Sequence, residues 1–180
     1  MDPLSVPNYV ISLEEISWGG TLVAITTAIH GVGMMGVLRT QEVLENRLRG
    51  KPTFAKGLLV VLASWMILLI HLLEILVWAG FLYWKGAVDS PNANASLCYY
   101  FSLNEYTTLG SDYKLILRWR LLEGMISVAG LLTFAWSTGV LFTLARSFQE
   151  QGLSTLRRSH GKVRSTPVSP SNPPYPVSAQ

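Results

Sequence analysis

Six residues in the second half of the chain have the composition of a cation-binding turn. They read Thr-Thr-Leu-Gly-Ser-Asp and occupy positions 107–112. Backbone carbonyls and threonine oxygens in such a turn can replace the water around a cation, which is how ion-selectivity filters work. Because threonine and glycine are also common in ordinary loops, the segments around the turn must decide between the two interpretations.

The segment before the turn, 96–106, alternates aromatic and polar residues at helical spacing and predicts a short helix. At about 1.5 Å per residue it measures about 16 Å, too little to cross a hydrocarbon core of about 30 Å. It is therefore either a surface helix or a re-entrant one, surrounded by protein or a water-filled cavity. The C-terminal end of a helix carries roughly half a negative charge, which favours a cation just beyond it.

The composition indicates an integral membrane protein. Of the 180 residues 49% are apolar and only 14% are charged, against about 25% charged in soluble domains. Three runs, 17–38, 57–84 and 120–146, are long and apolar enough to span a bilayer. We therefore predict an all-α membrane protein with three transmembrane helices, a pore helix at 96–106 and a filter loop at 107–112.

Small residues mark one face of the first run. Gly20, Ala24 and Ala28 are spaced four apart, and such a stripe allows another helix to approach closely. This additional helix is expected to lie outside the pore and to pack against the second span.

Basic residues predict the orientation in the membrane. They gather in a loop at 39–56 and in the tail after the third span (Arg39, Arg47, Arg49, Lys51, Lys56; Arg146, Arg157, Arg158, Lys162, Arg164). Both segments are cytoplasmic only if 96–106 does not cross, which favours three spans and an extracytoplasmic N-terminus at 1–16. That N-terminus has no basic region before its first apolar stretch, so no cleaved signal peptide is expected. The Pro/Ser-rich tail 148–180 is predicted to be disordered.

Two ionisable residues lie inside the second span. His71 and Glu74 are one helical turn apart on one face, and ionisable groups at this depth need protein partners. They can relay protons or ions, or they can anchor the short helix or the third span by hydrogen bonds, and we favour the anchor. Metal binding together with His30 is conceivable, but no ligand spacing supports it.

Three further positions, Glu105, Glu123 and Gly130, each have a predicted role. Glu105 can hydrogen-bond behind the turn, or it can titrate and make the protein pH-sensitive. Glu123 is expected to be a buried polar group that pairs with Arg120, three residues away, with Arg118 as a further partner. Gly130 can be a bending point of the third span or a site of close helix packing.

Several of these segments resemble a known family. Tyr100-Phe-Ser-Leu-Asn-Glu-Tyr-Thr-Thr-Leu-Gly110 resembles the pore helix and filter start of pore-loop potassium channels, in particular the bacterial two-span ion-channel domain family. Ser127-Val-Ala-Gly-Leu-Leu-Thr-Phe134 is similar to the inner helix of that family. His71-Leu-Leu-Glu74 with Trp78, Trp119-Arg-Leu-Leu and Trp136-Ser-Thr138 resemble a subfamily of bacterial channel-like proteins. The resemblance covers about half the chain, 57–147.

The resemblance implies a homo-tetramer in the bacterial inner membrane, with 57–84 as outer helix and 120–146 lining the pore. Monovalent cations, K⁺ and also Na⁺, would bind at Thr108 and Leu109, and Gly130 would be the hinge. The filter would be supported by its immediate neighbours (Asn104, Glu105, Tyr106, Tyr113). No other cofactor, no nucleic-acid partner and no enzyme activity is expected.

The filter departs from the family pattern after its third residue. The family reads Thr-Val/Leu-Gly-Tyr-Gly-Asp, whereas Gly110 is followed here by Ser111, Asp112 and Tyr113. Either Ser and Asp replace Tyr and Gly, or one residue is lost and the Asp keeps its place. Both alignments remove the second glycine, whose backbone freedom other residues lack. Tyr113 lies two positions late as a replacement for the missing Tyr.

The loss of the outer filter predicts weak discrimination between potassium and sodium. Asp112 would form a ring of carboxylates at the outer mouth that concentrates cations, or would be a solvated loop residue. The function predicted is an oligomeric, weakly selective pore-loop cation channel. The alternatives are a non-conducting or regulatory channel-like subunit and a pore for a different ion or small solute.

Overall fold

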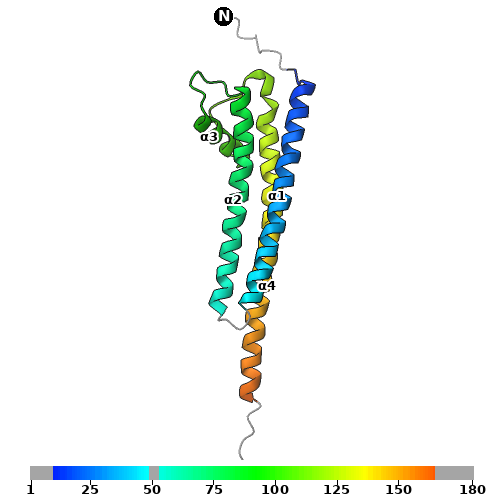
Figure 1. Ribbon diagram of the computed structural model, residues 1–180, viewed down its shortest axis with the longest axis vertical. Helices are drawn as coiled ribbons and strands as arrows, with labels where there is room; N and C mark the ends of the chain where they lie inside the picture. Colours follow the sequence, from blue (N-terminus) through cyan, green and yellow to red (C-terminus); the bar gives the residue numbers. More distant parts are fainter. Residues whose placement is uncertain (1–9, 49–52, 165–180) are drawn as a thin grey trace, which may run out of the picture.

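Three long helices form an elongated bundle in the computed structural model, which describes residues 10–48 and 53–164 (Figure 1). They are α1 (Leu13–Arg47), α2 (Thr53–Lys85) and α4 (Leu121–Arg164). A short helix, α3 (Ala95–Tyr106), lies beside one end of α2, and a 3-10 turn, η1 (Leu117–Trp119), precedes α4. Within the described residues the secondary structure is helical apart from one isolated bridge. All three long helices are long and apolar enough to cross a membrane.

The helices continue beyond the apolar runs that predicted them. The segment 39–56, predicted to be a loop, is mostly helix, because α1 runs to Arg47 and α2 begins at Thr53. The predicted disorder of 148–180 is wrong for its first half, since α4 reaches Arg164; positions 165–180 lie outside the described residues. Hydropathy marks only the part of a helix that lipid can cover, whereas Gln, Glu, Arg and Leu extend helices equally well in water.

The first helix packs against α2, as predicted, and also against α4. The stripe of Gly20, Ala24 and Ala28 is exposed, so it does not form the contact within the chain that its spacing predicted. The buried face of α1 is instead partly polar (Glu15, Gly19, Leu22, Thr26, His30, Met34, Val37, Gln41). A membrane helix can expose apolar residues to lipid, so burial does not follow apolarity as it does in soluble proteins.

Two other glycines of α1 mark its close contacts. A Cβ on Gly19 would lie 2.2 Å from the sulfur of Met125 in α4, and one on Gly33 would lie 2.6 Å from a methyl carbon of Ile70 in α2. The first helix therefore sits in the groove between α2 and α4.

The segments on either side of α3 are tied together at the end of the bundle. Val88 and Leu115 form an antiparallel bridge, the N–H of Asp89 donates to the Lys114 carbonyl at 2.8 Å, and the N–H of Ile116 donates to Ala87 at 2.9 Å. The chain thus leaves α2, makes α3, and returns to the same end of the bundle before α4 begins (Figure 1).

Candidate functional site

The short helix α3 is fixed at both ends. At its start the Asn94 side chain accepts a hydrogen bond from the N–H of Leu97 at 2.9 Å, which is a typical N-cap. At its end the Tyr106 carbonyl lies so close to α4 that a Cβ on Gly130 would be 2.0 Å from it. Gly130 therefore serves close packing, one of its two predicted roles; α4 passes through it as continuous helix, and the hinge stays a prediction.

The C-terminal end of α3 reaches deep into the bundle. Tyr106 is fully buried, and its hydroxyl donates a short hydrogen bond to Glu74 of α2. Glu74 lies about three turns before the end of α2 at Lys85, roughly 16 Å at about 1.5 Å per residue. This length along α2 equals about half the thickness of a hydrocarbon core of about 30 Å.

The backbone N–H groups of the turn 107–110 all donate hydrogen bonds to carbonyls of α3. The N–H of Thr107 donates to the Leu103 carbonyl, that of Thr108 donates to Glu105, and those of Leu109 and Gly110 donate to Asn104. In the described part of the chain, the carbonyls of 107–110 accept no hydrogen bond. These carbonyls are therefore available as acceptors within the single chain.

The backbone of this turn is also unusual. Thr108 has φ of 62° and Gly110 has φ of 76°. Glycine adopts such angles readily, but for a β-branched residue they are an outlier that costs of order 1–3 kcal/mol. Thr108 directly follows the C-cap of α3, where a left-handed residue is a common helix end, and the N–H groups of Thr108 and Leu109 donate to Glu105 and Asn104 as in that motif.

Glu105 supports the turn from behind. Its Oε1 accepts a hydrogen bond from the Ser111 N–H at 3.0 Å, and its carbonyl accepts one from the Ser127 hydroxyl of α4 at 2.8 Å. The hydrogen-bonding role predicted for Glu105 is thus present. Burial raises the pKa of the Glu105 carboxyl, and the hydrogen bond from Ser111 opposes this.

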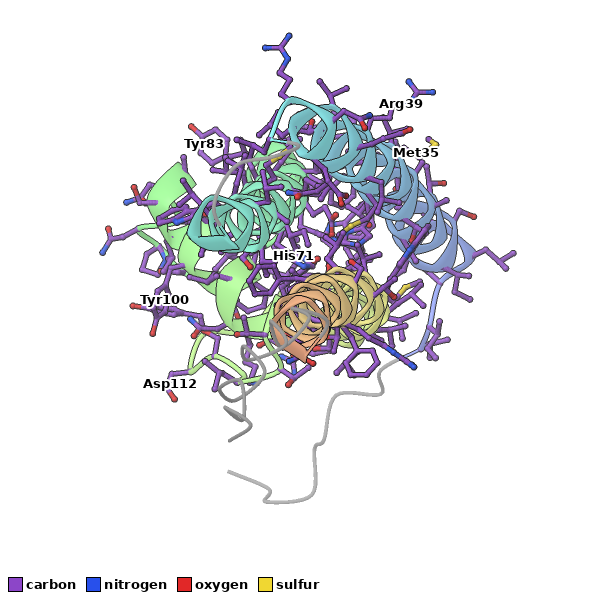
Figure 2. All side chains as sticks on the ribbon, turned by 90° about the horizontal axis from the view of Figure 1, so that it is seen from below. Met35, Arg39, His71, Tyr83, Tyr100 and Asp112 are labelled. Atoms are coloured by element: carbon purple, nitrogen blue, oxygen red, sulfur yellow. The ribbon has the colours of Figure 1, made fainter. Side chains whose placement is uncertain are left out.

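The outer residues of the turn are open to the surroundings of the single chain. Leu109 is 79% exposed, Asp112 is exposed and Tyr113 is 41% exposed. Seen along the bundle, Asp112 and Tyr100 project outward, whereas His71 lies in the middle between the helices (Figure 2). The Tyr113 N–H donates to the Ser111 hydroxyl at 3.2 Å, and the support of the turn by its side chain stays a prediction.

A buried polar cluster lies beneath the end of α3. We define it as six residues from four helices that are at most 5% exposed (His30, His71, Glu74, Tyr106, Thr133, Ser137). Glu74 contacts His30 Nδ1 at 2.8 Å, and His71 contacts the Tyr106 hydroxyl through Nδ1 and the Ser137 hydroxyl through Nε2, each at 3.0 Å. His71 thus contacts both α3 and α4, as the anchor interpretation predicted.

Other members of this cluster were not predicted as partners. Thr133 Oγ1 lies 2.6 Å from the Tyr106 hydroxyl, and Ser137 Oγ lies 3.3 Å from His30 Nε2. His30 and Ser137 are 107 positions apart, so no spacing rule could have joined them. The only sequence signal was that polar residues within apolar spans need partners.

Charged residues near the start of α4 hold the returning segment. Glu123 accepts the Leu115 N–H at 2.8 Å and pairs with Arg120 at 3.8 Å, which confirms that predicted pair. Its predicted burial is wrong, since the side chain is 16% exposed. The further partner predicted, Arg118, pairs with Glu14 of α1 instead. The Leu121 N–H donates to Glu15, so α1 also clamps the turn before α4.

Comparisons with family models, curated proteins and solved structures find no match for this chain. The candidate site must therefore be judged on its own geometry.

Proposed function

We propose that this chain is one subunit of an oligomeric pore-loop cation channel with weak selectivity between potassium and sodium. The observation that carries the proposal is the turn at 107–110, whose N–H groups are all used behind it while its carbonyls are free. A ring of such carbonyls from several chains can replace the hydration shell of a cation.

The position of the turn supports the same function. Because Tyr106 contacts Glu74 about halfway along a span, α3 and the turn are suited to a re-entrant pore loop. Non-helical backbone at this depth is tolerated only where protein or a water-filled cavity surrounds it. The helix start is at the outer end, and the C-terminal negative end points to the turn, which favours cations.

One chain supplies only one row of carbonyls, so a closed ring requires several copies. We propose a tetramer in a bacterial inner membrane, with the N-terminus outside and the basic ends of α1 and α4 in the cytoplasm. The exposed apolar residues of α4 (Val128, Leu131, Leu132, Phe142) are available for the pore lining, neighbouring chains or lipid.

The double substitution Ser111→Tyr, Asp112→Gly restores the family filter and tests the proposal. In liposomes, we expect the unmodified protein to pass both cations and the restored protein to prefer potassium. If only the restored protein passes ions, the natural chain is a non-conducting subunit. If neither passes ions, the pore itself is ruled out.

A further inference from the structure

Four oxygen and nitrogen donors converge inside the buried polar cluster. The Nδ1 of His30 lies 2.8 Å from Oε1 of Glu74, and the Nδ1 of His71 lies 3.9 Å from Oε2 of the same carboxylate. One ligand atom each from His30, His71 and Glu74 can be chosen so that all lie within 4.8 Å of one another. The Tyr106 hydroxyl supplies a fourth donor, 3.0 Å from His71 Nδ1.

The spacing of these donors is close to that of a tetrahedral metal site. Zinc bonds to nitrogen and oxygen measure about 2.0–2.2 Å, which places tetrahedral ligand atoms about 3.3–3.5 Å apart. The distances of 2.8, 3.0 and 3.9 Å lie on both sides of this value. These three separations each differ from the tetrahedral value by about half an ångström, whereas Tyr106 and Glu74, which share a short hydrogen bond, would have to move further apart.

The outer contacts of the two histidines also suit a metal. Ser137 Oγ lies 3.0 Å from Nε2 of His71 and 3.3 Å from Nε2 of His30. A hydroxyl oxygen has two acceptor lone pairs, so it can accept an N–H from both rings when both Nδ1 atoms hold a metal. A hydrogen-bond partner of this kind on the second ring nitrogen is usual for metal-binding histidines.

We propose that His30, His71, Glu74 and Tyr106 form a binding site for a divalent transition metal of the zinc class. Two imidazoles and a carboxylate are ligands that such ions accept, and the Tyr106 oxygen is the fourth oxygen or nitrogen atom beside them. With both imidazoles neutral, binding through Nδ1 leaves the His30 ring proton on Nε2, which faces Ser137. The Tyr106 hydroxyl proton, which otherwise goes to Glu74, is released to solvent when the oxygen binds as phenolate. The protein fills all four positions, so the site is a structural clamp that ties α3 to α1 and α2. It does not depend on whether the chain conducts ions.

The full-length protein, produced in zinc-supplemented medium and purified in detergent, gives the first test. We expect about one zinc per chain by mass spectrometry. Replacing zinc with Co²⁺ should give the intense visible absorption of a tetrahedral site, and zinc should raise the unfolding temperature of chelator-treated protein. Metal-free protein from this medium, with neither cobalt spectrum nor thermal shift, overturns the proposal.

Single substitutions locate the ion. Glu74→Gln keeps an oxygen that can accept the His30 N–H but removes the charge. This substitution and His71→Asn, each made alone, should abolish the cobalt spectrum. Ser137→Ala should weaken metal binding by about 10–100-fold, as loss of an outer partner does. His160→Ala removes the third histidine of the chain, in the last turns of α4, and should change nothing.

Two outcomes contradict the assignment. If Glu74→Gln is folded, as judged by circular dichroism, and binds cobalt like the unmodified protein, the ion is elsewhere. If only His160→Ala loses the metal, binding is adventitious and the cluster is solely a hydrogen-bonded anchor. The two proposals can fail separately. Zinc binding by a protein that passes no ions would contradict only the proposed function, and ion flux through a protein that binds no zinc would contradict only the metal site.

Discussion

At the scale of single residues, the contact between Gly130 and the Tyr106 carbonyl determines how closely α3 meets α4. A Cβ at position 130 would meet the backbone carbonyl of Tyr106, and backbone cannot move aside as a flexible side chain can. A glycine in the middle of a helix usually costs about 1 kcal/mol relative to alanine. The close contact with Tyr106 explains why a glycine occurs at this position despite that cost.

We predict that Gly130→Ala destabilises the protein by about 1–3 kcal/mol through overpacking. Gly139, in the same helix, has open space where a Cβ would lie, so Gly139→Ala should be neutral or stabilising. Unfolding midpoints of both variants in the same detergent provide the measurement. Equal midpoints would mean that α3 does not approach α4 as closely as described.

A second prediction at this scale concerns Glu105. Its folded pKa is raised by burial, so its buried charge opposes folding at neutral pH, and its contribution to stability is greatest in acid. Glu105→Gln keeps an acceptor for the Ser111 N–H and removes the charge, so it should be more stable than the unmodified protein at neutral pH. This advantage should shrink as the pH falls through the raised folded pKa and should be lost below the ordinary glutamate value, about 4.3.

Thermal unfolding across this pH range measures the effect. Glu42, an exposed glutamate of α1, supplies the control, and Glu42→Gln should lack the pH-dependent advantage. An advantage of Glu105→Gln that is equal at neutral and acid pH would show that burial of the charge is not its cause.

At the scale of elements, α3 is held by the Asn94 cap and the bridge at one end and by Tyr106 at the other.

Tyr106→Phe removes the hydroxyl that donates to Glu74, and an unsatisfied buried group costs about 1–3 kcal/mol. We expect faster hydrogen exchange throughout α3 in this variant. Tyr100→Phe, on the exposed side of α3 (Figure 2), should leave exchange unchanged. Equal exchange in both would contradict the anchor role of Tyr106.

The elements themselves were largely predictable from the sequence, because a run of about 20 apolar residues has few stable states other than a membrane-spanning helix. Their ends and faces were not. The buried face of α1 carries Thr26, His30 and Gln41, while Gly20 and Ala24 point outward. In lipid the sequence does not distinguish a face that packs on protein from one that faces acyl chains.

The site was predictable to a similar extent. Glu105 hydrogen-bonding behind the turn and His71 as an anchor follow from local rules about polar groups in apolar surroundings. The identity of the partners does not, because Ser137 and Thr133 come from a helix that the sequence places far away. Arg118 shows the same limitation, since its partner Glu14 lies at the start of α1.

At the scale of the whole molecule, the proposed assembly turns one exposed Asp112 per chain into a ring of charge. Asp112→Asn should lower cation flux at low ionic strength, where the carboxylates attract cations from solution. The difference should shrink at high salt, because the Debye length falls to about 3 Å at 1 M. Flux assays at two salt concentrations, with Asp89→Asn as a control in the preceding loop, test this. A deficit that is independent of salt would place Asp112 away from the pore mouth.

Ion flux through the unmodified protein in liposomes tests the central claim most directly. Vesicles loaded with potassium or with sodium, and matched vesicles without protein, report how fast each cation crosses. Because the proposed filter has Ser111 and Asp112 where potassium filters have Tyr and Gly, we predict flux of both cations with at most a modest preference for potassium. Flux of neither cation, or of potassium alone, would contradict the account.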